Sequence, residues 1–299
     1  MERSLLIRAG YNLILLQEAE KIFSLLSLNG IPVILLKGLA LAETVYEHAG
    51  ERQFSDIDFL LKKRDIPLAQ KIISGSGYQV MHGSKPYYTK KTSLPVNLHL
   101  HRDIPYAAEG DIWNNLQSIR INNTKVYILP PEENLLYLIY HLAISHGCIK
   151  EKWIKDIDRV VRHYEKEIDW LKLTNKAKVY GLTIPSYYTF LKTKELFFTP
   201  VPDSVIQDLR SKRNSLRSGI CRLVFQKESP VPFAGYLLKA LFFPRMAFSS
   251  LFPSRDFLKR RYRTSSPLIY SYYIVRPFSL FFRGVLAVKG VVSRKLQEY

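Results

Sequence analysis

The chain has 299 residues, of which 47% are hydrophobic and 23% charged, a balance that excludes a disordered, collagen-like or coiled-coil protein. Its two cysteines, Cys148 and Cys221, are too few for a disulfide framework or a four-thiolate zinc site, which favours a reducing, cytoplasmic location. The formal net charge is +18, and the last 99 residues contain 18 basic and 5 acidic side chains.

The first part of the chain mixes helical and strand patterns. Leu5–Leu28 repeats apolar side chains at helical spacing before Asn29-Gly30, so it predicts an amphipathic helix with a typical C-terminal stop. Short apolar or alternating runs bounded by turn residues predict strands. The further elements expected here are helices over Leu39–Tyr46 and Ile66–Ser74, and strands over Pro32–Leu36, Ser55–Leu61, Tyr78–His82, Tyr87–Lys90, Val96–Leu100 and Val126–Leu129.

The pattern changes after Pro130-Pro131, where helical spacing takes over. We therefore expect an α+β protein: a mixed-sheet domain over residues 1–130 with an N-terminal helix, followed by a helical domain over 131–299 with a basic tail. The helices expected in this second part are Glu132–His146, Trp153–Tyr164, Trp170–Tyr180, Pro185–Phe197 and Ser204–Gln226.

The most informative motif is Ser55-Asp56-Ile57-Asp58-Phe59, two acids spaced i, i+2 on an apolar strand. This spacing places both carboxylates on one face. Adjacent carboxylates repel each other unless a cation lies between them, and Mg²⁺ is commonly held by one or two carboxylates together with substrate phosphates. An exposed strand face is the alternative interpretation. Upstream, Lys37-Gly38 joins a strand to a helix, an arrangement that suits phosphate binding.

These motifs together resemble the bacterial uncharacterised nucleotidyltransferase family of the polymerase-beta-like superfamily. The resemblance implies a mixed-sheet nucleotidyltransferase fold, and transfer of an NMP from an NTP to an unidentified acceptor with Mg²⁺ held by Asp56 and Asp58. It also implies nucleotide binding by Lys37, Gly38, Arg52 and Ser55. The segments that carry it are Leu35–Leu41, Arg52, Asp56–Leu60, Asn97–Leu100, Pro131–Leu136 and Trp153–Ile157.

One residue departs from the superfamily pattern. A third carboxylate, commonly the base that deprotonates the acceptor, is expected where this chain has Asn97, and asparagine cannot take a proton. Either another residue is the base, with His99 and Asp156 as the catalytic candidates, or the protein is a degenerate module that binds nucleotide without turnover. We expect Asn97, His99 and His101 to share one face of a strand that lies beside the Asp56–Asp58 strand.

Two further interpretations compete with this one. His99, His101, His141 and His146 suggest zinc, but no cysteine lies close in sequence and no third ligand is evident. The basic C-terminal third, with its aromatic stretch Tyr270–Arg283, predicts association with RNA or with an anionic membrane surface at the inner face, unless it is simply a solvated or packed segment.

Overall fold

The structure is a computed structural model with two compact units, Met1–Asn134 and Leu135–Tyr299, each described by itself. The first unit contains a mixed sheet and the second is helical, so the expected α+β class is confirmed. His82, Phe281 and Arg283 lie outside the described residues. The structure describes residues 2–81, 87–91, 94–146, 150–210, 216–226, 234–253, 255–262, 267–276, 278–279 and 282.

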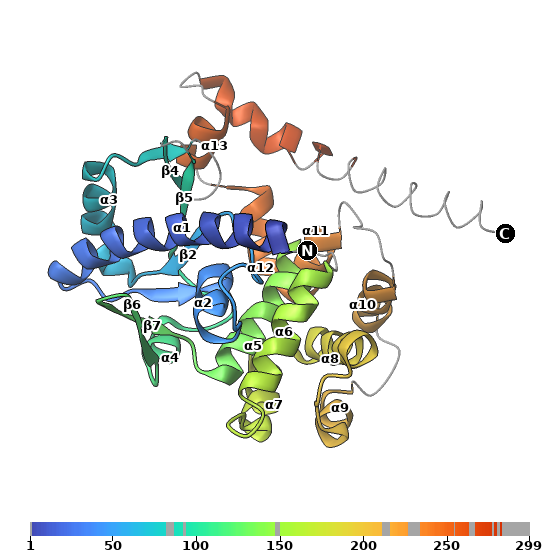
Figure 1. The fold of residues 1–299 in the computed structure, drawn as a ribbon. Helices are drawn as coiled ribbons and strands as arrows, with labels where there is room; N and C mark the ends of the chain where they lie inside the picture. Colours follow the sequence, from blue (N-terminus) through green and yellow to red (C-terminus); the bar gives the residue numbers. More distant parts are fainter. Residues whose placement is uncertain are drawn as a thin grey trace. The chain divides into compact units, whose positions relative to one another are not determined.

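A seven-stranded sheet forms the centre of the first unit, in the order β3-β4-β5-β2-β1-β7-β6 (Figure 1). The β1–β7 and β2–β5 pairs are parallel, and the β1–β2, β3–β4, β4–β5 and β6–β7 pairs are antiparallel. The strands are β1 (Ile34–Leu36), β2 (Ile57–Leu60), β3 (Gln79–Met81), β4 (Tyr87–Lys90), β5 (Val96–His101), β6 (Gln117–Ile121) and β7 (Thr124–Ile128).

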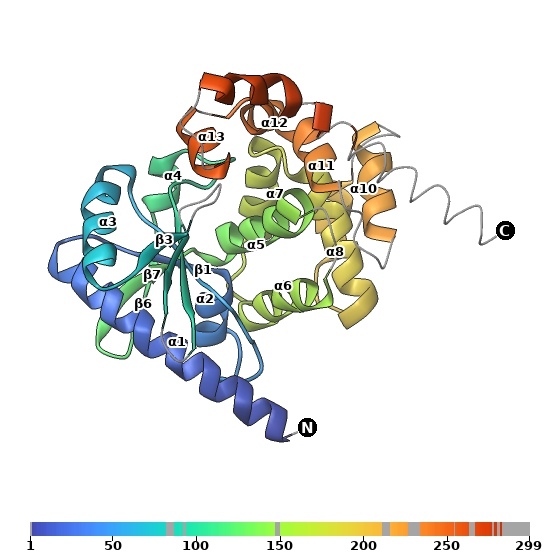
Figure 2. The same cartoon turned by 90° about the horizontal axis from the view of Figure 1, so that it is seen from above.

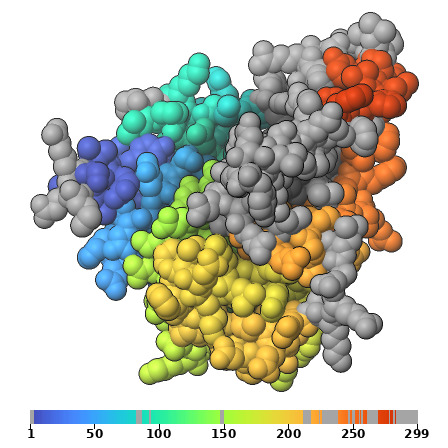
Figure 3. Space-filling model, turned by 90° about the vertical axis from the view of Figure 1, so that its right-hand side faces the viewer, coloured from blue at the N-terminus to red at the C-terminus, as the bar shows by residue number. Residues whose placement is uncertain are grey.

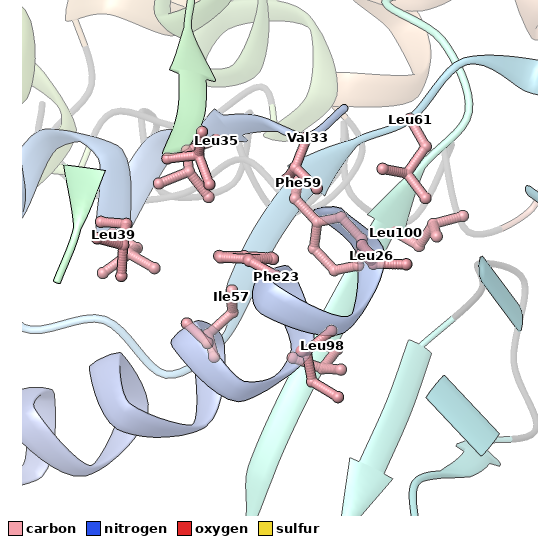
Figure 4. Close-up of a cluster of buried hydrophobic side chains, with 14 of the residues drawn as sticks. Phe23, Leu26, Val33, Leu35, Leu39, Ile57, Phe59, Leu61, Leu98 and Leu100 are labelled. Atoms are coloured by element: carbon pink, nitrogen blue, oxygen red, sulfur yellow. The ribbon is translucent and has the colours of Figure 1, made fainter. Parts of the chain in front are cut away.

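Side chains of α1, α2 and α3 pack against an apolar face of this sheet (Figure 2). Phe23 and Leu26 pack against Phe59, and the Phe23 and Phe59 rings meet edge to face with centroids 5.5 Å apart (Figure 4). Gly30 ends the first helix with φ +71°, a left-handed conformation that glycine adopts without penalty. The helical elements are α1 (Glu2–Leu28), α2 (Lys37–Thr44), the 3₁₀ turn η1 (Lys63–Asp65), α3 (Ile66–Gly75) and α4 (Glu109–Trp113).

The second unit consists of helices, and the side chains of α8 and α9 form the yellow part of the surface in Figure 3. No helix among the described residues combines the length and the apolar character that a membrane crossing requires. The elements are α5 (Pro131–Ile139, which begins in the first unit), the π-helix η2 (Tyr140–His146), α6 (Glu151–His163), α7 (Trp170–Val179), α8 (Thr183–Phe197), α9 (Asp203–Leu209), α10 (Leu216–Gln226), α11 (Ala234–Phe242), α12 (Pro244–Leu251), α13 (Arg255–Tyr262) and η3 (Pro267–Ser271).

Two expectations need correction, and two elements were not expected. The single helix expected over Ser204–Gln226 is wrong, because the backbone of Arg210 is extended and ends α9 there. The expected helix Glu132–His146 changes from α to π geometry at Tyr140. The sequence pattern predicts neither α4 nor β6, both five-residue elements whose mixed polar and apolar residues give little periodic signal.

Candidate active site

The polar side chains of the site lie on the sheet face opposite the apolar core. Side chains alternate along a strand, so the faces of β2 and β5 can be assigned from burial. Ile57 and Phe59 on β2, and Leu98 and Leu100 on β5, belong to the hydrophobic core. Their neighbours on the same strands therefore face the other way, and Asp58 is the register partner of His99. The expected pairing of the two strands is confirmed.

Three nitrogen atoms converge on one carboxylate oxygen, Asp58 Oδ1. Lys37 Nζ lies 2.6 Å away, His99 Nδ1 2.7 Å and His101 Nε2 2.8 Å. Burial opposes ionisation of Asp58, but the Lys37 ammonium and the hydrogen bonds with His101 and His99 outweigh it. The pKa of Asp58 is consequently held well below its usual range, and the carboxylate is ionised at neutral pH.

His101 contributes a neutral imidazole to this cluster. Burial lowers its pKa from 6.5 to about 4, with a smaller contribution in the same direction from His99 and Lys37, while Asp58 acts in the opposite sense. At pH 7 one ring nitrogen of His101 therefore keeps a lone pair. The side chain is only 15% exposed, so the imidazole ring is largely shielded from water.

The turn from β1 into α2 brings Lys37 to Asp58. The backbone leaves the extended conformation of Leu36, at φ −130°, and enters the left-handed region at Lys37, at φ +52°. A non-glycine residue there is strained, and such strain persists where the surroundings hold the residue in place. The ion pair of the buried Lys37 with Asp58 is the interaction that holds it.

Gly38 has a packing role in the structure. A Cβ atom built at this position would lie 2.5 Å from Cβ and 3.2 Å from Cγ of Phe54, a buried residue just before the acidic pair. Because the nearest atom is the first side-chain carbon, rotation of the Phe54 ring cannot make room. Glycine is thus required for α2 to approach this loop, and phosphate binding by Gly38 stays a prediction.

Asp56 lies half-buried at the start of β2, where Ser55 Oγ donates a weak hydrogen bond of 3.3 Å to its Oδ1. Burial and the charge of Asp58 raise the pKa of Asp56, and the opposing effects of Lys37 and His99 are smaller. Asp56 is therefore a carboxylate whose negative charge is incompletely compensated. Ser55 is exposed, and its predicted contact with a nucleotide stays a prediction.

Arg52 is buried in the loop between α2 and β2, at 7% exposure. Its Nη1 donates to the carbonyl oxygen of Gln53 at 2.5 Å, and its own carbonyl oxygen accepts a hydrogen bond from Asn12 Nδ2 at 2.9 Å. The Asn12 contact ties the loop to α1, and the guanidinium contact with Gln53 lies within the loop. The guanidinium thus has a structural function in this state, and triphosphate binding by Arg52 stays a prediction.

Asn97 lies on β5 two residues before His99, on the same face by the alternation of the strand, and it is paired with Thr89. Among the described residues, the acidic, histidine and cysteine side chains whose ligand atoms group within 4.8 Å of one another are Asp58, His99 and His101. Asp58 supplies the one carboxylate of this group of described residues, and Asp56 does not belong to it. The third side chain that could hold a metal beside the histidine pair is Asp58, on the neighbouring strand.

Tyr87 is a site residue that the sequence pattern does not predict. It is the register partner of His99 on β4, and the two rings stack with centroids 4.1 Å apart and planes 14° from parallel. Burial raises the pKa of Tyr87, as do the charges of Asp56 and Asp58, so the phenol is neutral at physiological pH. The strand itself was expected, but only its register with β5 reveals the contact.

The remaining predicted residues belong to the second unit. Asp156 is buried on α6, at 1% exposure, and its role as a base stays a prediction. The rings of His141 and His146 lie against each other and against Trp153, with centroids between 4.5 and 5.2 Å apart. Association of the basic C-terminal third with RNA or anionic lipid also stays a prediction.

Comparison with known proteins places these features in context. A family model described as "Uncharacterised nucleotidyltransferase" matches residues 1–198, which include the whole first unit. No curated protein matches the sequence. The crystal structure of an antigenic nucleotidyltransferase-like protein from Paracoccidioides brasiliensis is similar with a TM-score of 0.46 and 14% identity, over 71% of this chain and 97% of that chain.

Proposed function

Because this chain belongs to the uncharacterised nucleotidyltransferase family, we propose that it transfers a nucleoside monophosphate from an NTP to an acceptor hydroxyl or phosphate. An acceptor oxygen attacks the α-phosphorus, the bond from that phosphorus to the bridging oxygen breaks, and pyrophosphate leaves. The observation that carries the proposal is the Asp56–Asp58 pair beside the Lys37 ammonium, at the start of α2.

The donor set of this pair fits Mg²⁺ accompanied by a triphosphate. Asp56 and Asp58 would hold the ion through oxygen atoms, the ligands that Mg²⁺ prefers, with phosphate oxygens and water completing its shell. Burial, and to a smaller extent the charge of Asp58, raises the pKa of Asp56, and a cation at the pair would offset both effects, which supports this assignment. When bound, Mg²⁺ would neutralise charge on the triphosphate.

Lys37 and the first turn of α2 would bind and orient the phosphates. The ammonium of Lys37 is held within the site, and the first N–H groups of a helix have no partner within the helix, so they favour an anion. The long side chain of Lys37 allows the ammonium to move from Asp58 to a phosphate without movement of the backbone.

A second candidate function is nucleotide binding without turnover, and the observation that favours it is Asn97. Its amide cannot accept the proton that the acceptor loses. His99 and Asp156 are the alternative bases that we predict, and His99 lies on the same face of β5 as Asn97. The two functions differ in whether a proton acceptor is present near the attacking oxygen.

The proposed function is tested by measuring NTP affinity and NMP transfer with and without Mg²⁺. We expect Mg²⁺ to tighten NTP binding to the wild type, and Asp56→Asn to remove that effect because the neutral amide is a weaker Mg²⁺ ligand. Asp103→Asn, which changes an exposed acid of the same unit, is the matched control. Equal NTP affinity with and without Mg²⁺ would contradict the assignment of the pair.

Transfer activity separates the two candidate functions. Labelled NTPs incubated with cell extract report transfer to any acceptor present. Activity in the wild type supports a substitute base, and activity only in Asn97→Asp supports a degenerate site. Absence of both transfer and nucleotide binding in the two proteins would refute the proposal.

A further inference from the structure

We propose that Asp58, His99 and His101 form a binding site for a borderline divalent transition metal such as Zn²⁺. The metal competes with the Lys37 ammonium for Asp58. The ligand atoms of these three side chains lie within 4.8 Å of one another. This site goes beyond the proposed transfer, because it requires neither a nucleotide nor an acceptor.

The geometry needs little change to admit a metal. His99 Nδ1 and His101 Nε2 lie 2.7 and 2.8 Å from Asp58 Oδ1. Ligands about 2.0–2.2 Å from a tetrahedral ion are separated by roughly 3.3 Å. Each contact must therefore open by roughly half an ångström, a movement within the range of side-chain adjustment.

The donor chemistry selects the class of metal. Two imidazole nitrogens and one carboxylate suit Zn²⁺ and its transition-metal neighbours, whereas Mg²⁺ prefers oxygen ligands. Three protein ligands also leave coordination positions for water or substrate, as in catalytic rather than closed structural metal sites.

The pairing of β2 with β5 fixes the relative positions of Asp58, His99 and His101 without a metal. Asp58 and His99 are register partners on the parallel β2–β5 pair, and His101 follows His99 by two residues on the same face. Tyr87 stacks on the His99 ring from β4, which restricts rotation of that ring. Supporting contacts of this kind orient metal ligands, and Tyr87 is accordingly a positioning residue.

Lys37 occupies part of the space that the metal needs. Its Nζ lies 2.6 Å from Asp58 Oδ1, the same oxygen that both histidines contact. A divalent cation bound to that oxygen would lie close to the ammonium, and like charges at such separation in a buried site repel strongly. The metal and the Lys37 ammonium therefore exclude each other at Asp58.

The test is Zn²⁺ binding to the tag-free, nucleotide-free full chain, measured by calorimetry and by metal content after gel filtration. We expect one tightly bound Zn²⁺, and Mg²⁺ should not displace it. His101→Gln keeps a hydrogen-bond donor but removes the imidazole, so it should weaken Zn²⁺ binding at least tenfold, the loss that even a supporting contact to a metal ligand commonly causes. His48→Gln, at an exposed histidine of the same unit, should leave the affinity unchanged.

A second variant is expected to strengthen Zn²⁺ binding, a result that loss of folding could not produce. Lys37→Met removes the competing ammonium while keeping an unbranched side chain, and it should tighten Zn²⁺ binding at least tenfold. Zn²⁺ binding by Lys37→Met that is lost again in the double variant with His101→Gln also supports the proposal. The proposal is overturned if neither the wild type nor Lys37→Met binds Zn²⁺, or if His101→Gln leaves the Zn²⁺ affinity unchanged in whichever of these two proteins binds Zn²⁺. Because no nucleotide is present, these outcomes are independent of whether transfer occurs.

Discussion

Replacement of Gly38 by alanine tests how closely α2 approaches the loop before the acidic pair. The added Cβ would lie 2.5 Å from Cβ of Phe54, a distance that real Cβ atoms essentially never show. Overpacking of this kind costs about 1–3 kcal/mol, whereas alanine in a helix is favoured over glycine by up to about 1 kcal/mol. The clash exceeds the gain, so we expect Gly38→Ala to lower the free energy of unfolding by about 1–2 kcal/mol.

The matched control is Gly75→Ala in α3, where a Cβ would meet no atom within 4 Å. That change should be neutral or stabilise the chain by up to about 1 kcal/mol. Urea unfolding of the full chain, followed by far-ultraviolet circular dichroism, measures both. Since Phe54 must move and lies two residues before Asp56, Gly38→Ala should also weaken NTP binding. If the two glycine variants changed stability alike, the assigned contact of Gly38 with Phe54 would be refuted.

Two further predictions concern an ion-pair cluster on α1 and the coupling of two ligands at the site. Glu18 accepts hydrogen bonds from Lys21, Lys90 and Tyr78. Burial opposes ionisation of Glu18, but these contacts hold its pKa below 4.5. The stability that they contribute is therefore present above about pH 4.5 and is lost as the pH falls through the lower pKa of the folded state. Glu18→Gln should therefore be about 1–2 kcal/mol less stable than the wild type at pH 7 and nearly equal at pH 3 in urea unfolding, and a pH-independent difference would contradict this. If a triphosphate draws the Lys37 ammonium away from Asp58, NTP and Zn²⁺ should each tighten binding of the other by the same factor, and calorimetric titration in both orders checks this equality.

The sequence was informative about faces and poorly informative about register. Alternation along Val96–Leu100 indicates that Asn97 and His99 share a face, because side-chain direction is a local property of an extended chain. Which residue on another strand meets His99 depends on pairing across 41 positions, and no local pattern determines that. The contribution of Asp58 to the histidine pair therefore became visible only from the parallel β2–β5 register.

The missed strand β6 shows a different limit. Its residues Gln117–Ile121 include few apolar side chains, so hydrophobic alternation is weak. The signal that could have found it is the Asn122-Asn123 turn that joins it to β7, with Asn122 at φ +48°. Asparagine tolerates this left-handed conformation and is common in two-residue hairpins. Turn chemistry was thus more informative here than hydrophobicity.

The three nitrogen contacts of Asp58 affect both the proposed cation binding and the proposed phosphate binding. A carboxylate has two oxygens, and one of those of Asp58 already contacts Lys37, His99 and His101. Any cation that binds this oxygen must displace the ammonium, whereas a cation held through the second oxygen and Asp56 can coexist with it. Lys37 is also the residue whose backbone is strained, at φ +52°, and the ion pair offsets that strain. When a cation removes Lys37 from Asp58, a triphosphate at the start of α2 would provide the ammonium with another anion.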